Sequence, residues 1–299
     1  MNEIKRISDR VAVLRDGEYI NTVVTAETEI DEIIKMMVGR DVSHNIRKTK
    51  SSVPVDAPVI LEAEHITSPK IDDVTFNLRQ GEILGFAGLV GSGRTEVMRL
   101  IFGADPMESG EIRIRGQKIN VATPQDAVSA GVAYLSEDRK RYGLVLGLTV
   151  TGNATIASLD KFLSHRLFID KKSGRMETQK YIDNLRIKTP SSEQLVKNLS
   201  GGNQQKVVIA KWLIRDTDIL IFDEPTRGID IGAKAKIYNL MEDLVKAGKS
   251  IIMISSELPE ILRMSDRVVV MCNGRKTAEL DIAEADSEII MKYATQFSD

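Results

Sequence analysis

The amino-acid sequence predicts an α/β fold with a mainly parallel sheet from about residue 59 onward. Short apolar runs alternate with amphipathic helical patterns, which is typical of parallel strands joined by crossover helices. The composition agrees, because 42% hydrophobic and 28% charged residues are the balance of a globular chain. The runs that we expect to form strands lie at 83–87, 132–135, 219–222, 251–254 and 268–271.

The expected helices are recognised by their apolar spacing. Residues 94–102 carry Val97, Leu100 and Ile101 on one face and are followed by Gly103, a common helix stop. Apolar residues at i, i+3, i+4, i+7 and i+8 predict a second helix from Ile237 to Val245. The stretch from about 148 to 200 has helical patches and no clear strand, so we expect an inserted helical lobe there.

Charge and rare residues exclude several function classes. The net charge is −2, so no global basic field favours nucleic acid. The single cysteine, Cys272, excludes an intrachain disulfide and fits a reducing compartment. Three histidines are too few for a His-rich metal site, and no apolar stretch approaches the ~20 residues that span a bilayer.

The chain contains an internal repeat. Residues 3–19, EIKRISDRVAVLRDGEY, match residues 260–276, EILRMSDRVVVMCNGRK, with nine identities at one constant offset. Residues 47–58, RKTKSSVPVDAP, are polar, contain two prolines and indicate a linker. We therefore expect the tail of a first copy of a domain at 1–45, a linker at 46–58 and one complete copy at 59–299.

A glycine-rich loop, GLVGSGRT, lies between the first strand and the first helix. Glycines let backbone N–H groups turn toward a phosphate, and the helix N-terminus adds its dipole. Arg94 stands where the phosphate-loop pattern has lysine, which puts placement of the γ-phosphate in doubt. The alternative is a turn without a ligand. The candidate nucleotide-binding residues are Gly88, Val90, Gly91, Ser92, Gly93, Arg94, Thr95 and Glu96.

Two adjacent carboxylates follow the apolar run at 219–222. Ligands of open α/β sheets bind at the carboxyl ends of the strands. We expect Asp223 and the Thr95 hydroxyl to hold Mg²⁺, and Glu224 to polarise the attacking water as general base. The alternative is a strand followed by an acidic turn.

A second anion-seeking helix start occurs in the same domain. Ser200 can cap the helix that follows, and glycines expose backbone N–H groups at its beginning. We expect this motif to contact a phosphate that is bound on a partner domain. Its residues are Leu199, Ser200, Gly201, Gly202, Asn203 and Gln204.

The motif LSGGNQQ (199–205), with the phosphate loop before it and FDEPTRGID (222–230) after it, resembles the ATP-binding cassette of ABC transporters. Stretches such as LSEDRKRYGLVLGLTV (135–150) look most like the second cassette of the tandem-cassette ATPases of bacterial sugar importers, of the ribose type. The resemblance implies a P-loop NTPase fold with a RecA-like core, an antiparallel β lobe and an inserted helical lobe. It also implies ATP and Mg²⁺ as cofactors.

In that family each ATP lies between the phosphate loop of one cassette and the signature motif of the other. The resemblance makes Glu224 catalytic and assigns Asp230 to the loop that crosses between cassettes. Glu137 replaces the usual glutamine and Ser256 the usual histidine. Together with Arg94, these departures suggest that the ATP site on this cassette's own phosphate loop is degenerate. The signature motif of this cassette is intact and would serve the ATP that its partner holds.

The leading hypothesis is therefore the ATPase subunit of an importer for ribose or a related monosaccharide, peripheral at the cytoplasmic face of the plasma membrane. The expected partners are a first cassette or a second copy, membrane permease subunits and, indirectly, a sugar-binding protein. Residues 137–141, EDRKR, are either a solvated loop or a contact with a membrane subunit. The counterpart of Ser256 would lie just before Met1, so we expect a truncated product, an engineered fragment or an incomplete gene model.

Two other hypotheses about function remain. The chain could be a catalytically weak nucleotide-binding regulatory fragment, which Arg94 and Ser256 favour. A DNA-repair or ribosome-associated ABC protein is the third reading, and the near-neutral charge argues against it.

Overall fold

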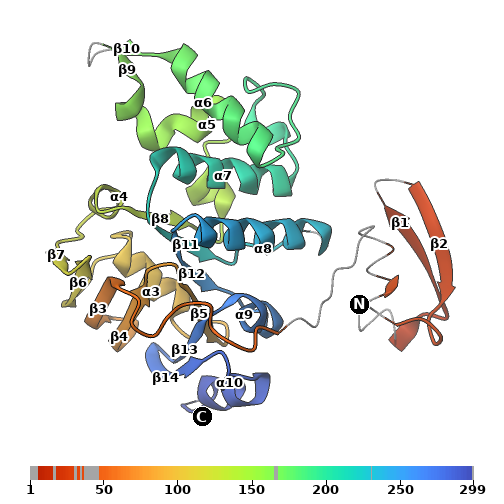
Figure 1. Ribbon diagram of the computed structural model, residues 1–299, viewed down its shortest axis with the longest axis horizontal. Helices are drawn as coiled ribbons and strands as arrows, with labels where there is room; N and C mark the ends of the chain where they lie inside the picture. The colour runs from red at the N-terminus through yellow and green to blue at the C-terminus, as the bar shows by residue number, and fades with distance from the viewer. Residues whose placement is uncertain are drawn as a thin grey trace.

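The computed structural model describes residues 6–15, 18–29, 32–33, 36, 47–164, 168–229 and 231–297. The cassette from Val59 onward has three parts, a central mixed sheet, a small antiparallel sheet and a helical lobe (Figure 1). The predicted RecA-like core, antiparallel β lobe and helical lobe are thus all present. No helix of the described part is long and apolar enough to cross a membrane.

The central sheet has the order β14-β13-β5-β12-β11-β8, and only β14 runs antiparallel to its neighbour. Each of the five predicted apolar runs forms one of its strands. Because β5, β12 and β11 are parallel neighbours, the loops after them open at one edge of the sheet. The strands are β5 (Ile83–Gly88), β8 (Val132–Leu135), β11 (Ile219–Asp223), β12 (Ser250–Ile254), β13 (Arg267–Cys272) and β14 (Arg275–Asp281).

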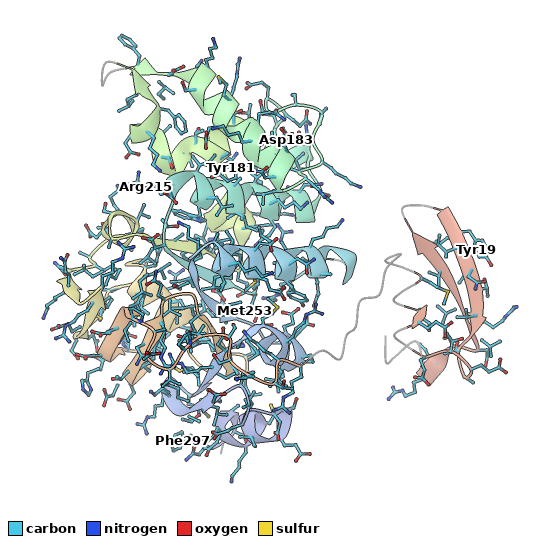
Figure 2. The ribbon with its side chains drawn as sticks, in the orientation of Figure 1. Tyr19, Tyr181, Asp183, Arg215, Met253 and Phe297 are labelled. Atoms are coloured by element: carbon cyan, nitrogen blue, oxygen red, sulfur yellow. The ribbon has the colours of Figure 1, made fainter. Side chains whose placement is uncertain are left out.

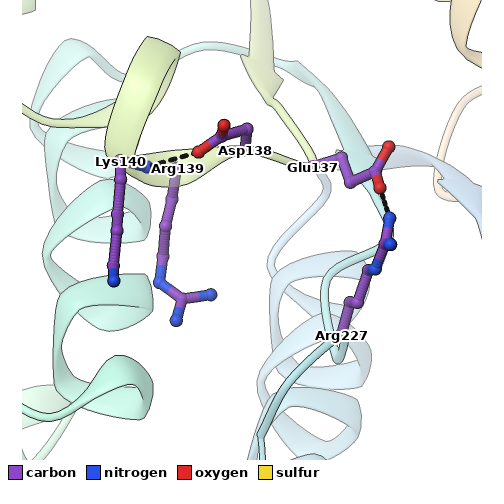
Figure 3. A pocket seen from close by; sticks show the side chains of 5 residues that line it. All are labelled: Glu137, Asp138, Arg139, Lys140 and Arg227. Atoms are coloured by element: carbon purple, nitrogen blue, oxygen red, sulfur yellow. Dashed lines mark hydrogen bonds and ion pairs between the residues drawn. The ribbon is translucent and has the colours of Figure 1, made fainter.

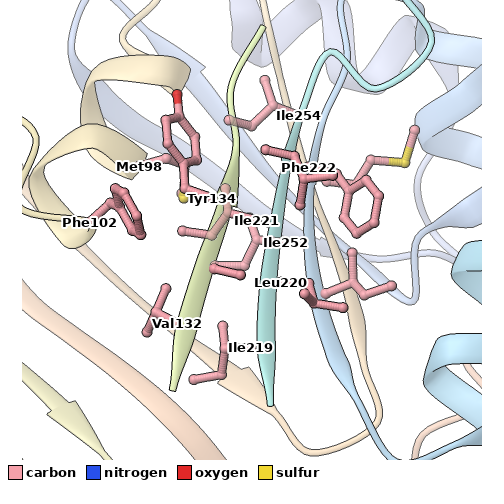
Figure 4. Packing of buried hydrophobic residues seen from close by; sticks show 14 of the residues in the cluster. Met98, Phe102, Val132, Tyr134, Ile219, Leu220, Ile221, Phe222, Ile252 and Ile254 are labelled. Atoms are coloured by element: carbon pink, nitrogen blue, oxygen red, sulfur yellow. The ribbon is translucent and has the colours of Figure 1, made fainter. Parts of the chain in front are cut away.

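The sheet forms the main hydrophobic core. Phe86 and Phe222 are fully buried, as is Met253, which lies on the central strand β12 (Figures 2 and 4). Such strands, apolar on both faces, are expected where helices cover a parallel sheet. The helices of this part are α3 (Arg94–Ile101), α4 (Pro124–Ser129), α8 (Ile231–Lys246), α9 (Leu258–Met264) and α10 (Ser287–Ala294).

The two smaller parts flank this core (Figure 1). The antiparallel sheet has the order β4-β3-β6-β7 and consists of β3 (Val59–Ser68), β4 (Ile71–Arg79), β6 (Ser109–Ile114) and β7 (Gln117–Ile119). The helical lobe contains α5 (Val150–Thr155), η2 (Ile156–Phe162), α6 (Lys171–Asn184), η3 (Val196–Asn198) and α7 (Gly201–Arg215). It also contains a short strand pair that the pattern did not predict, β9 (Leu163–Ser164) and β10 (Phe168–Ile169).

The predicted linker is bound to the cassette along residues 47–58. It contains no helix or strand, but the Lys48 N–H donates to the Leu262 carbonyl at 3.0 Å. The fully buried Asp266 accepts from Lys48 Nζ at 2.7 Å, and from Ser51 and Ser52 at 2.8–3.1 Å. Burial alone would raise the pKa of Asp266, but the Lys48 ammonium and these hydrogen bonds hold it below its usual value.

The sequence repeat is also a structural repeat. The hairpin of β1 (Arg10–Arg15) and β2 (Glu18–Val24) has the same bounds, at the repeat offset, as β13 and β14. Both hairpins shift register at the equivalent step, Val13/Leu14 and Val270/Met271. Equivalent hydrogen bonds follow both, from Thr25 N to Asp9 O at 2.9 Å and from Ile282 N to Asp266 O at 3.2 Å. The repeat positions Glu3, Ile4 and Gly17 lie outside the described residues.

The two hairpins differ in what covers them. Strand β13 pairs with β5 along its second edge, whereas β1 pairs with β2 alone among the strands that the structure describes. Consequently Leu14 is 63% exposed, while its counterpart Met271 is 0% exposed. Tyr19, labelled in Figure 2, also lies exposed on the first hairpin.

Candidate functional site

The glycine-rich loop joins β5 to α3 at the carboxyl edge of the central sheet. Gly88 and Gly93 have φ values of 152° and 99°. A Cβ on Gly88 would lie 2.4 Å from Met271 O, and a Cβ on Gly93 would lie 2.9 Å from Ile71 Cδ1 and 3.1 Å from Gly274 Cα. Gly91 has a φ of 82°, and a Cβ there would meet no heavy atom within 4 Å. The loop is therefore packed against its own sheet on one side and open on the other.

The hydroxyl of Thr95 and the carboxylate of Asp223 lie together beside this loop. Thr95 Oγ1 donates to Asp223 Oδ1 at 3.1 Å, and Tyr134 Oη donates to Asp223 Oδ2 at 2.6 Å. Burial raises the pKa of Asp223, against the opposing effect of these two hydrogen bonds. Sequence reasoning missed Tyr134, whose hydroxyl is the one polar side-chain group in the apolar run of β8.

The phosphate-loop cation, Arg94, turns toward the two residues that follow the neighbouring strands. Its Nη1 donates to the Ser255 carbonyl at 2.6 Å, and its Nη2 lies 3.9 Å from Glu224 Oε1. Ser256 Oγ donates to Glu224 Oε2 at 3.1 Å. Burial raises the pKa of Glu224, and the Arg94 charge opposes that rise. Glu224 has a φ of 48°, a strained conformation for a side chain of this size.

Glu260 holds the turn after β12 in place, a role that the sequence did not indicate. Its carboxylate accepts from Ser255 Oγ at 2.8 Å, Thr226 Oγ1 at 2.7 Å and Tyr238 Oη at 2.5 Å. Burial would raise the pKa of Glu260, but these hydrogen bonds and that from Lys234 keep it below its usual value. One buried carboxylate thus ties together the segments that follow β11 and β12.

The signature residues lie at the beginning of α7 in the helical lobe. Ser200 is the N-cap residue as predicted, but the predicted side-chain cap is wrong, because the Asn203 amide donates to Ser200 Oγ at 2.9 Å instead. Leu199 and Gln204 are buried and pack inside the lobe, whereas Ser200 is exposed. Ser200 is therefore the exposed residue of the motif, and the two glycines and Asn203 are half-buried.

Glu137 lies in a pocket with Asp138, Arg139, Lys140 and Arg227 (Figure 3). Its carboxylate forms an ion pair with Arg227, which follows the Asp223–Glu224 strand. The guanidinium of Arg139 packs against the signature motif, since a Cβ on Gly201 would lie 2.6 Å from its Nη2. The remaining predicted position, Asp230, lies outside the described residues.

The residues at the loop fit a magnesium nucleotide. Ser92 Oγ is buried without a hydrogen-bond partner inside the loop, and the side of Gly91 is open. One carboxylate and one hydroxyl are the protein ligands that Mg²⁺ ordinarily takes when substrate phosphates supply the rest. No group of three or more His, Cys, Asp or Glu side chains that could hold a metal ion occurs in the described part of the chain. The loop backbone between Gly88 and Glu96, with the side chains of Thr95 and Asp223, would hold the nucleotide and its ion.

A phosphate loop at the strand edge, a helical lobe with its own glycine-rich helix start and an antiparallel β lobe together define the nucleotide-binding cassettes of the ABC type. The sequence model described as ABC transporter matches residues 71–227, more than half of the chain. The chain belongs to the ABC transporter family.

The chain is similar along 99–100% of its length to several curated proteins. It is 54% identical to a putative ribose/galactose/methyl galactoside import ATP-binding protein from Burkholderia ambifaria, of which it covers 58%. It is 47% identical to a ribose import ATP-binding protein from Clostridium tetani, of which it covers 59%. The chain thus spans between one half and two thirds of the length of these relatives.

Solved structures agree with the fold. The ADP conformation of MJ1267, an ATP-binding cassette of an ABC transporter, superimposes with a TM-score of 0.65 at 22% identity, over 78% of this chain and 94% of that one. The dimeric post-hydrolysis structure of the cassette MJ0796 gives 0.64 at 19% identity, over 75% and 99%. At such identities these likenesses concern the fold, and the predicted P-loop ABC cassette is confirmed.

Proposed function

We propose that the chain is the ATP-binding and ATP-hydrolysing part of a bacterial ABC sugar importer, for ribose or a related monosaccharide. The observation that carries this is the geometry at the strand edge, where the phosphate loop, Thr95, Asp223 and Glu224 lie together. The names of the relatives supply the substrate class. ATP and Mg²⁺ are the cofactors, and the bound ion supplies charge neutralisation during phosphoryl transfer.

The exposed Ser200 and the glycine backbone at the start of α7 support a role in trans. In this proposal the signature motif contacts the ATP that the phosphate loop of a partner cassette holds. The partner is a first cassette, or failing that a second copy of this chain. The complex also contains membrane permease subunits and works with a sugar-binding protein, at the cytoplasmic face of the plasma membrane.

The first 45 residues are, in this proposal, the tail of that first cassette. Support comes from the hairpin β1–β2, which repeats β13–β14 in bounds, register shift and flanking hydrogen bonds. Leu14 adds support, because its counterpart in the complete cassette is buried. Residues 46–58 then connect the two cassettes, and residues 59–299 form the second.

Replacing Ser200 in the assembled transporter tests this proposal. Ser200→Arg places a long side chain where the partner's ATP is expected, so steady-state ATPase activity should fall to background. Met176→Arg is the matched control, because Met176 is 61% exposed on the same lobe and lies outside the motif. Unaltered turnover in Ser200→Arg would contradict the proposal.

The second candidate function is a nucleotide-binding regulatory fragment without hydrolysis of its own. The positions of Arg94 and Ser256, both bonded to protein groups, favour it. The 299-residue chain is assayed with Mg-ATP. Turnover above about 1 s⁻¹, within the ordinary range of enzymes, that Glu224→Gln abolishes would exclude this candidate. Turnover below that value would favour it for the isolated chain.

A further inference from the structure

The positively charged side chain of the phosphate loop, Arg94, already contacts protein groups. Arg94 is 7% exposed, and its guanidinium bonds the Ser255 carbonyl at 2.6 Å and faces Glu224. In the usual phosphate loop a lysine at this position reaches the β- and γ-phosphates. A guanidinium is a planar fork whose donors can satisfy two protein acceptors at once, whereas an ammonium is a compact charge on a flexible stem.

The groups that hold Arg94 are themselves fixed. Ser255 is 1% exposed, and its hydroxyl donates to Glu260 while accepting from the Glu257 N–H at 3.0 Å. Glu260 is anchored further by Thr226 and Tyr238. The Ser255 carbonyl therefore cannot follow Arg94 toward a ligand. Moving the guanidinium to a phosphate would strand that buried carbonyl and remove the cation that faces Glu224, both of which are costly.

The carboxylate of Glu224 is held from two sides. Arg94 Nη2 lies 3.9 Å from Oε1 and Ser256 Oγ donates to Oε2 at 3.1 Å, so both oxygens already have a protein contact. The segments after β11 and β12 are thus joined through Arg94 by protein contacts alone. A γ-phosphate is not needed to connect them.

We propose that Arg94 makes this half-site indifferent to the γ-phosphate, so that it holds a nucleoside diphosphate about as tightly as a triphosphate. This inference rests on the nucleotide binding proposed above. The backbone N–H groups of the loop and the Thr95–Asp223 pair grip the α- and β-phosphates and their ion. Arg94 stays on Ser255 and Glu224, and contributes a structural clamp instead of a phosphate contact.

Binding to the 299-residue chain tests the proposal. Fluorescent mant-ADP is bound in the presence of Mg²⁺ and displaced by ADP or by the non-hydrolysable β,γ-imido analogue of ATP. We expect dissociation constants within about threefold of each other for the wild type. Arg94→Lys frees a flexible cation and should favour the triphosphate by about tenfold or more. Arg99→Lys, on the same helix but paired with Asp105, should leave the ratio unchanged.

A second variant and a nucleotide-free measurement guard against misfolding. The double variant Arg94→Met/Glu224→Gln removes the pair without leaving either charge buried alone, and should bind both nucleotides within about threefold of wild type. Without nucleotide, Arg94→Lys should speed hydrogen exchange of the Glu257 amide by about tenfold or more, since the clamp on Ser255 is lost.

Three results would overturn the inference. The first is a wild type that prefers the triphosphate by about tenfold. The second is a preference unchanged in Arg94→Lys, and the third is loss of triphosphate binding in the double variant. If no variant binds mant-ADP, the proposed nucleotide function fails as well, so the two failures are distinguishable.

Discussion

The hairpins β1–β2 and β13–β14 are the same unit in two surroundings. Their first strands are similar in sequence, and the two hairpins share strand bounds and the position of a register shift. In the second hairpin, β5 pairs with the other edge of β13 and every residue of β13 is buried, whereas Arg10, Ala12 and Leu14 of β1 are exposed. The comparison teaches that local sequence specifies the ladder of hydrogen bonds, while the energetic value of each side chain depends on the remainder of the cassette.

The largest expected effect contrasts Asp266 with its counterpart Asp9. Asp266→Ala leaves the buried Ile83 N–H and the Lys48 ammonium without their acceptor, so we expect a loss of about 3–5 kcal/mol in the free energy of unfolding. Asp9 is exposed, and Asp9→Ala should change the free energy of unfolding by less than about 0.5 kcal/mol. Urea unfolding of both variants measures the difference. Equal losses would mean that the two aspartates have equivalent roles.

A smaller difference is expected between the apolar counterparts Met271 and Leu14. Met271→Ala opens a cavity in the core and should cost about 2–3 kcal/mol. Leu14→Ala should cost less than about 0.5 kcal/mol, because Leu14 is mostly exposed. The urea concentrations at the unfolding midpoints of the two variants measure this difference. If residues 1–45 belong to a first cassette, Leu14→Ala should approach the cost of Met271→Ala in a protein that contains that cassette.

The smallest effect is the pH dependence of the Asp266 contribution. Because the pKa of Asp266 is lowered in the folded state, its stabilisation is complete above the unfolded pKa of about 3.9. It is lost as the pH falls through the lower folded pKa. The gap in unfolding free energy between wild type and Asp266→Ala should therefore narrow below about pH 3.9. A gap that widens on acidification would show that the carboxylate is not stabilised in its charged form.

The features predicted from the sequence are those that neighbouring residues determine. The five apolar runs became strands, and the glycine loop took the positive φ values that its glycines allow. The features that were missed depend on distant partners. The linker binds Asp266 more than 200 positions away, and the Tyr134 hydroxyl reaches Asp223 on the neighbouring strand, 89 positions along the chain. The Ser200 cap failed for a local reason, since Asn203 competes for the same hydroxyl.

The buried Asp266 also determines where this chain can be divided for separate expression. The first strand of the cassette begins at Val59, which is where a boundary drawn from regular secondary structure would fall. A shortened chain starting there would keep the whole central sheet but lose Lys48, Ser51 and Ser52, which donate to the Asp266 carboxylate. Of the described donors to that carboxylate, the Ile83 N–H would remain. A boundary that keeps these contacts therefore lies at or before Lys48, inside the segment whose composition is typical of a linker.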